Sequence, residues 1–172
     1  YFFYDWEITY GIADTELETA WGALPDPSTG TPMNANNQGL LFTAKRDFIL
    51  SEVDILAAST GDLLVCLFDE NDTLLKFKKI EIDTPNVLKK LNLNWEISKG
   101  EDYKIRASGV QLSTQLIPNF ANNPIDIQGV ACITQGLAGT GSLNNRFHFF
   151  YNWKIQFSPP HLPKSNRTRA DV

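Results

Sequence analysis

The sequence predicts an all-β protein, an antiparallel β-sandwich of the jelly-roll or Greek-key type. Two observations carry this prediction. Apolar and polar residues alternate with a period of two in several segments, most clearly in residues 88–97 and 146–157. Polar segments rich in Gly, Pro, Asn and Asp separate these strands. A helix is expected only over residues 12–22, so about eight or nine short strands must make up the fold.

The first strands in the chain form recognisable units. Residues 48–55 alternate, but the phase slips between Leu50 and Val53, which predicts a bulge or a short break near Ser51. Residues 63–82 are predicted to form a β-hairpin, since two strand-like runs flank a polar turn. Lysines in the second of these runs favour an edge or solvent-facing position.

The later strands carry most of the aromatic residues. Residues 129–134 are expected to form a short strand, and residues 146–157 the last one. In the last strand, one predicted face carries Phe147, Phe149, Tyr151, Trp153 and Ile155, and the other carries His148, Phe150, Asn152 and Lys154. The segments expected to be connections are 22–39, 109–128 and a flexible glycine loop at 136–142.

A short aromatic segment occurs twice. FFYDWEI at residues 2–8 closely matches FFYNWKI at 149–155. The first copy is either the closing strand of a preceding repeat or this domain's own first strand. We therefore divide the chain into an aromatic strand (1–12), a sandwich module (13–157) and a Pro-rich linker or extended tail (158–172). The expected partners are neighbouring repeats or copies, joined by strand pairing.

Bulk properties limit the partners and the chemistry. The chain has 172 residues and a net charge of -5, so it has no electrostatic reason to bind nucleic acid or anionic lipid. No apolar run approaches the ~20 residues that membrane insertion requires. The chain begins without Met and shows no signal peptide, which is typical of a processed product or a fragment. Cys66 and Cys132 lie outside any metal-binding spacing; they form either a disulfide or, as we favour, two separate thiols.

A resemblance to a known module appears across residues 39–155. The segments that carry it are GLLFTAKRDFILSEVDILAAS (39–59), GDLLVCLFDENDTLL (61–75), LKKLNLNWEISKGEDYKIRASG (88–109), IDIQGVACITQG (125–136) and HFFYNWKI (148–155). Their order resembles a β-sandwich module of large secreted and surface-bound proteins of Bacteroidota, typically cargo of the type IX secretion system. Trp95 stands where that module often has Phe, and residues 98–100 replace its usual Pro-containing turn. The resemblance implies an extracellular or cell-surface, non-catalytic module, often present in tandem.

Catalytic chemistry finds little support in the sequence. His148 and His161 are the only histidines, and neither is accompanied by a patterned nucleophile. The glycine loop lacks the Lys-Ser/Thr of a phosphate-binding loop. We therefore expect a protein that is not an enzyme and that carries no cofactor.

The hairpin tip is a candidate for calcium binding and for modification. Asp69, Asn71 and Asp72 offer the oxygen ligands that calcium prefers, although a polar hairpin turn explains them equally without an ion. Asn71 and Asn166 begin N-x-[ST] sequences. Thr73 lies in a DTL sequence that resembles the O-glycosylation motif of exported Bacteroidota proteins.

Carbohydrate binding requires exposed aromatic rings beside polar partners. Trp21 and Phe120 lie in predicted loops, with Asn36 and Asn122 among the candidate polar partners; alternatively, Trp21 covers one end of the sandwich. Two functions follow. The first is a non-catalytic extracellular module that acts in adhesion or as a spacer in a repetitive protein. The alternative is a carbohydrate-binding module appended to a secreted enzyme.

Overall fold

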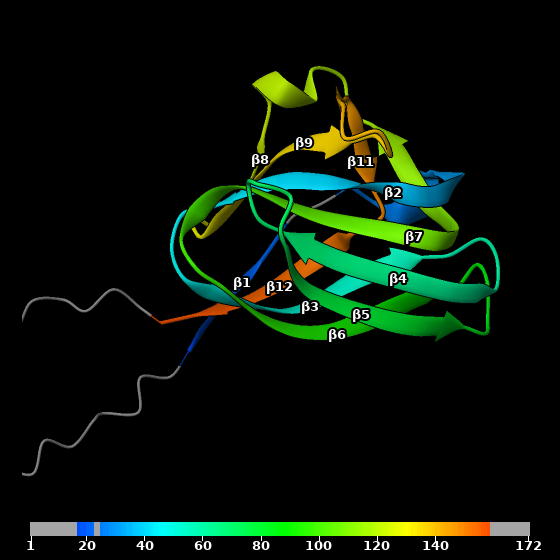
Figure 1. The fold of residues 1–172 in the computed structure, drawn as a ribbon, viewed down its shortest axis with the longest axis horizontal. Coiled ribbons are helices and arrows are strands. Elements are labelled where there is room, and N and C mark those ends of the chain that lie inside the picture. The colour runs from blue at the N-terminus through cyan, green and yellow to red at the C-terminus, as the bar shows by residue number, and fades with distance from the viewer. Residues whose placement is uncertain (1–16, 23–24, 159–172) are drawn as a thin grey trace, which may run out of the picture.

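A computed structural model describes residues 17–22 and 25–158 and shows two antiparallel β-sheets packed face to face (Figure 1). The small sheet contains, in order, β1 (Glu18–Trp21), β12 (Tyr151–Phe157), β3 (Phe48–Leu56) and β6 (Leu88–Ile97). The large sheet contains β10 (Leu143–Asn144), β9 (Ala131–Leu137), β2 (Thr31–Ala44), β7 (Gly100–Leu116), β4 (Gly61–Phe68) and β5 (Leu74–Ile82). In the large sheet, β8 (Ile125–Ile127) also pairs with β9 and β11 (Arg146–His148) with β7. The predicted all-β sandwich is confirmed.

The connectivity is that of a jelly roll. Strands β1, β3, β6 and β12 belong to the small sheet, while β2, β4, β5 and β7 form a continuous block of the large sheet. The chain thus passes repeatedly between the two sheets, which is how double-sheet jelly rolls are built. Two short 3-10 helices, η1 (Pro27–Thr29) and η2 (Phe120–Asn122), lie in the connections. The duplicated segment at residues 2–8 lies outside the described residues.

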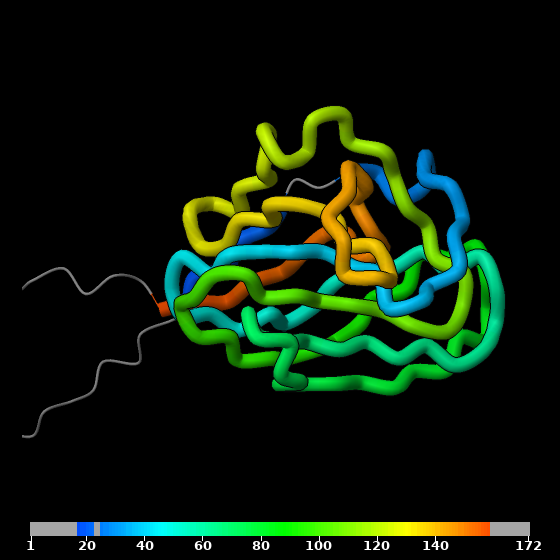
Figure 2. Tube along the Cα trace, turned by 45° about the horizontal axis from the view of Figure 1, so that its top comes forward, coloured from blue at the N-terminus to red at the C-terminus, as the bar shows by residue number. Residues whose placement is uncertain are grey.

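The ends of the described domain lie together. Strands β1 and β12 are antiparallel neighbours, and Glu18 pairs with Phe157. Figure 1 shows the two strands side by side in colours from opposite ends of the sequence, and the tube in Figure 2 shows both reaching the same end of the sandwich. The sheet is therefore completed by residues that are almost the full length of the domain apart.

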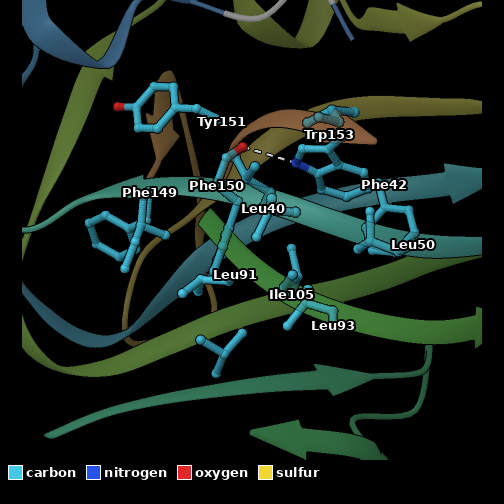
Figure 3. Close-up of a cluster of buried hydrophobic side chains, with 14 of the residues drawn as sticks. Leu40, Phe42, Leu50, Leu91, Leu93, Ile105, Phe149, Phe150, Tyr151 and Trp153 are labelled. Carbon is cyan, nitrogen blue, oxygen red and sulfur yellow. Dashed lines mark hydrogen bonds between the residues drawn. The ribbon is translucent and has the colours of Figure 1, made fainter. Parts of the chain in front are cut away.

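Aromatic residues dominate the core between the sheets. Trp153, Tyr151 and Phe42 are among its largest fully buried side chains. The Phe42 ring on β2 meets the edge of Trp153 on β12 with ring centroids 5.1 Å apart, so this contact joins the two layers. Figure 3 shows these rings among leucines from both sheets. The alternation in residues 88–97 is confirmed, since Leu91, Leu93, Trp95 and Ile97 are all buried.

The predicted last strand is in fact two strands in different sheets. Strand β11 pairs with β7 of the large sheet, whereas β12 pairs with β1 and β3 of the small sheet. The chain crosses between the layers at Phe149, whose φ of 68° breaks the extended conformation. The prediction that Phe150 faces outward is therefore wrong, because both Phe149 and Phe150 are buried at the crossing (Figure 3).

Three further expectations are corrected. The end of the expected helix, Glu18–Trp21, is strand β1. The expected connections 22–39 and 109–128 contain long strand ends, because Thr31 of β2 pairs with Thr114 of β7. Their Pro, Asn and Ser content suggested loops, but pairing between these two strands satisfies the backbone groups of both. The hairpin at 63–82 and the bulge at Ser51 are confirmed, since β4 pairs with β5 and the register of β3 shifts between Leu50 and Glu52.

The glycine loop is closely packed, so the expectation of a flexible connection is also wrong. A Cβ added at Gly136 would lie 1.9 Å from the backbone oxygen of Arg146, and one at Gly139 would lie 2.2 Å from that of Asn36. The side-chain amide of Asn37 also donates to the oxygen of Gly139. The glycines allow this close backbone approach, which fixes the loop against β2 and β11.

Lysines cover the side of the sandwich where β5 and β6 form the sheet edges. Lys78 of β5 donates a hydrogen bond to the backbone oxygen of Asn92 in β6. Lys89 of β6 donates reciprocally to the oxygen of Glu81 in β5, at 3.0 Å. These contacts occupy edge carbonyls that a foreign strand would otherwise use.

Candidate functional site

Trp21 stands at the edge of the small sheet. Its backbone pairs with Lys154 of β12, and its oxygen accepts a 3.5 Å hydrogen bond from the Gln128 side chain. The neighbouring Ala20 is fully buried, so the alternation of β1 directs the Trp21 ring to the outer face of the sheet. Trp21 is 49% exposed, as the hypothesis of a carbohydrate platform requires.

A chain of polar contacts begins beside the Trp21 ring. The Lys154 ammonium lies 5.5 Å from the ring centroid and 3.2 Å from the Glu52 carboxylate. Glu52 also meets Lys90 at 3.4 Å, and Lys90 meets Asp54 at 3.1 Å. The side-chain amide of Asn152 donates to the other oxygen of Asp54 at 2.9 Å. We call these five side chains the polar ladder.

The ladder is held on one face by strand register. Glu52 lies opposite Lys154 of β12 and Asn92 of β6, while Asp54 lies opposite Lys90. Residues between the ladder positions, such as Val53, are buried in the core. The ladder therefore extends across three strands on the outer face, starting next to Trp21.

The electrostatics of the ladder are balanced. It contains two ammonium groups and two carboxylates, each in contact with an opposite charge. Desolvation raises the pKa of Glu52, but the hydrogen bonds and charges of Lys154 and Lys90 outweigh it, so the net pKa is lowered. The hydrogen bond that Lys90 donates to the Asp54 carboxylate is the main cause of its raised pKa. The two positive and two negative side chains thus give the ladder no net formal charge.

The second aromatic candidate for carbohydrate binding is Phe120, and the expectation that its ring is exposed is wrong. It is fully buried, and its ring packs against Phe147 with centroids 6.2 Å apart. Phe120 therefore closes one end of the core, because η2 folds the long β7–β8 connection inward. It is unavailable as a binding platform.

The asparagines do not join Trp21. Asn36 lies on β2 opposite Ser108, in the large sheet, and Asn122 is exposed in η2. Among the described residues, no hydrogen bond connects either side chain to Trp21. The polar groups near Trp21 are instead the ladder residues, which the sequence analysis missed as a site. Their outward phase was readable in each strand, but the order β12–β3–β6 was not.

The hairpin-tip acids have partners within the protein. One oxygen of Asp69 accepts hydrogen bonds from the backbone nitrogens of Asn71 and Thr73, which forms the turn. Asp72 meets Arg106 at 2.9 Å and Lys104 at 3.1 Å. Among the described residues there is no cluster of three His, Cys, Asp or Glu side chains that could hold a metal ion. The tip therefore has the contacts of a structural turn, and calcium binding there stays a prediction.

The two cysteines are free thiols. Cys66 lies on β4 and Cys132 on β9, with β7 and β2 between them. At about 4.8 Å per strand spacing, this places them roughly 14 Å apart, well beyond the span of a disulfide. Burial raises the pKa of both thiols, so neither is activated as a nucleophile.

His148 is part of the packing. It is 1% exposed, its Nδ1 lies 3.4 Å from the Thr114 hydroxyl and its Nε2 lies 3.2 Å from the Asn144 amide oxygen. Burial, assisted by the charge of Arg146, lowers the pKa of His148 to about 4. Both ring nitrogens therefore lie next to uncharged side chains, those of Thr114 and Asn144.

The predicted modification sites fall at the hairpin tip and beyond. Asn71 and Thr73 are exposed in the β4–β5 turn, where a modifying enzyme has access. Asn166 and His161 lie outside the described residues.

The sequence matches no protein-family profile and no curated protein. In the part of the chain that the structure describes, no helix has the length and apolar character needed to cross a membrane.

Proposed function

We propose that this chain is a non-catalytic, extracellular β-sandwich module that acts in adhesion, and that it binds carbohydrate on the outer face of its small sheet. The observation that supports this proposal is the half-exposed Trp21 ring beside the polar ladder. The extracellular setting rests on the resemblance of residues 39–155 to secreted modules.

The chemistry of the face suits a sugar. An indole ring stacks on the apolar C–H patches of a pyranose, and fixed carboxylate, amide and ammonium groups can bond its hydroxyls. The ladder groups are already held by each other, so little side-chain entropy is lost when a ligand binds. The absence of net charge on the ladder favours a neutral ligand over a charged one.

The positions of the first and last strands bear on the choice between an adhesive role and a spacer role. Glu18 and Phe157 are cross-strand partners, so the two ends of the described domain lie together. A module joined to its neighbours through these two residues would project sideways and add little length to an array. This geometry favours the adhesive role over the spacer role.

A glycan array followed by affinity gels tests the proposal. We expect saturable binding to a neutral glycan, and we expect Trp21→Ala to reduce it by at least about tenfold, as loss of a stacking ring should. Phe77→Ala is the matched control: Phe77 is 66% exposed, but it lies on β5 of the large sheet, so this variant should bind normally.

The ladder supplies a second variant. Asn152→Ala removes an amide from the face while leaving Trp21 intact, and weaker binding is expected. Unchanged thermal unfolding of the variants would show that they fold. If the wild-type chain binds no glycan on the array, or if Trp21→Ala binds as tightly as wild type, carbohydrate binding at this face is wrong.

A further inference from the structure

A hollow with a partly apolar lining lies at one end of the small sheet. Its volume is about 290 Å³, close to the lower end of the range for small-ligand pockets. Leu17, Ile49 and Phe157 form its apolar lining, and Gln156, Asp47 and Glu96 are among its polar groups.

The hollow continues the Trp21 face. Gln156 lines the hollow, and it is two residues along β12 from Lys154, whose ammonium lies over the Trp21 ring. Thr19 of β1 pairs with Gln156, just as Trp21 pairs with Lys154. From Leu17 to Trp21 the extended chain covers about 13 Å. Both features thus lie along the same pair of strands.

The polar groups of the hollow are held in place. The Gln156 amide oxygen accepts a 2.9 Å hydrogen bond from the hydroxyl of Ser51, which leaves its amide nitrogen to donate. One oxygen of Asp47 accepts the backbone N–H of Lys99 at 2.7 Å. The hollow therefore offers both a donor and carboxylate acceptors above an apolar floor.

The charges around the hollow are balanced. Asp47 and Glu96 line it, and two cationic residues adjoin it: Arg46, whose guanidinium carbon lies 5.2 Å from the centroid of the Phe157 ring, and Lys99, which follows the lining residue Ser98 and donates its backbone N–H to Asp47. Two charges of each sign favour a neutral ligand over a charged one at this end of the face.

We propose that the hollow and Trp21 form one extended site for a neutral, linear oligosaccharide, with one sugar ring stacked on Trp21 and another in the hollow. This inference rests on the proposed function and adds the class of ligand. A monosaccharide reaches only one of the two subsites, whereas a longer chain gains from both because the second contact is intramolecular.

The test measures affinity against chain length. Calorimetry is performed with the neutral glycan that the array identifies, from the monosaccharide to the hexasaccharide, and with the same chain carrying uronic acids. Affinity for wild type should rise steeply with length until both subsites are filled, and the uronic-acid chain should bind more weakly.

Variants of the hollow separate this inference from the proposed function. The double variant Leu17→Ala/Glu96→Ala changes exposed side chains of the hollow and should lower affinity for the longer chains by about tenfold, with no effect on the shortest ligand that binds Trp21. Val87→Ala is the matched control, since Val87 is exposed in another hollow of about 310 Å³, between β5 and β6.

The outcomes are distinct. If binding depends on Trp21 but not on chain length or on the hollow variants, the proposed function stands and the extended site is wrong. Equal or tighter binding of the uronic-acid chain would contradict the assignment of a neutral ligand. No binding to any glycan on the array would overturn both proposals.

Discussion

The indole nitrogen of Trp153 donates a 2.9 Å hydrogen bond to the backbone oxygen of Phe150 (Figure 3). Phe150 lies where the chain crosses from the large sheet to the small one, and Trp153 is the first aromatic residue after Tyr151 in β12. The bond therefore satisfies a carbonyl group that the crossing removes from the β-ladder. One side chain both fills the core and fixes the path of the chain between the layers.

Replacing Trp153 should destabilise the domain strongly. Trp153→Ala removes a fully buried ring, its contact with Phe42 and the partner of the Phe150 oxygen, at an expected cost of about 3–5 kcal/mol. Chemical denaturation measures the free energy of unfolding. Trp21→Ala is the control, since its ring is half exposed and should contribute little. A loss below about 1 kcal/mol for Trp153→Ala would contradict its placement.

Protonation of His148 should make the domain less stable in mild acid. Its pKa is lowered from 6.5 to about 4 by burial, so the unfolded chain binds the proton more readily than the folded one. The stabilisation is therefore fully present above about pH 6.5 and is lost as pH falls towards 4, by up to about 3 kcal/mol. Unfolding measured between pH 7 and 5 should show this slope, and His148→Gln should flatten it. An equal slope in both proteins would contradict the assignment.

Asp72 should stabilise the hairpin more than an acid whose cationic partner is also exposed. Asp72 forms ion pairs with Lys104 and Arg106. The Nε of Arg106 is buried and has no hydrogen-bond partner among the described residues. A hydrogen bond from Lys104 is the main cause of the lowered pKa of Asp72, so its stabilisation is present at neutral pH and is lost in acid. Asp72→Asn should cost up to about 1 kcal/mol, because Asp72 is 58% exposed and solvent screens its charge. Asp62→Asn is the control, because Asp62 and its partner Lys79 are both exposed, and it should change the free energy of unfolding little. Equal losses in the two variants would show that the Asp72 contacts add no special stability.

The reciprocal lysines should keep the chain from associating through its edges. Lys78→Ala/Lys89→Ala frees the carbonyl groups of Asn92 and Glu81 on adjoining sheet edges. Light scattering and sedimentation should then show association that depends on concentration. Lys76→Ala/Lys99→Ala is the control, since it also removes two exposed lysine charges but frees neither of these carbonyl groups. Equal association of the control would point to net charge as the cause.

The fold class was predicted from local patterns of alternation and turns. The prediction failed where burial depends on pairing between strands that are far apart in the sequence. Alternation identified β4 and β6, because each has one buried face and one more exposed face, and the polar turn between β4 and β5 identified the hairpin. The same alternation treated Phe149 and Phe150 as opposite faces of one strand. A change of sheet buries both, and it depends on which strands accept β11 and β12.

The candidate site was predicted only in part, again because local patterns do not show which strands pair. Trp21 was identified because its aromatic ring lies outside the strongly alternating segments. It was expected in a loop, but it lies in strand β1. Phe120 met the same criterion, but it is buried because η2 turns inward. No pattern in the neighbouring residues reveals that turn. The ladder residues required the pairing of β3 with strands about 40 and 100 residues later, which only the folded topology provides.

The pairing of Glu18 with Phe157 also determines how the domain responds to mechanical load. Tension applied at these two residues pulls β1 and β12 apart from one end, so it acts on one hydrogen bond at a time instead of shearing all of them together. The strands should separate at low force, and β1, which carries Trp21, would be removed first. A glycan bound to Trp21 on an adhesive surface would thus be released before the rest of the sandwich unfolds.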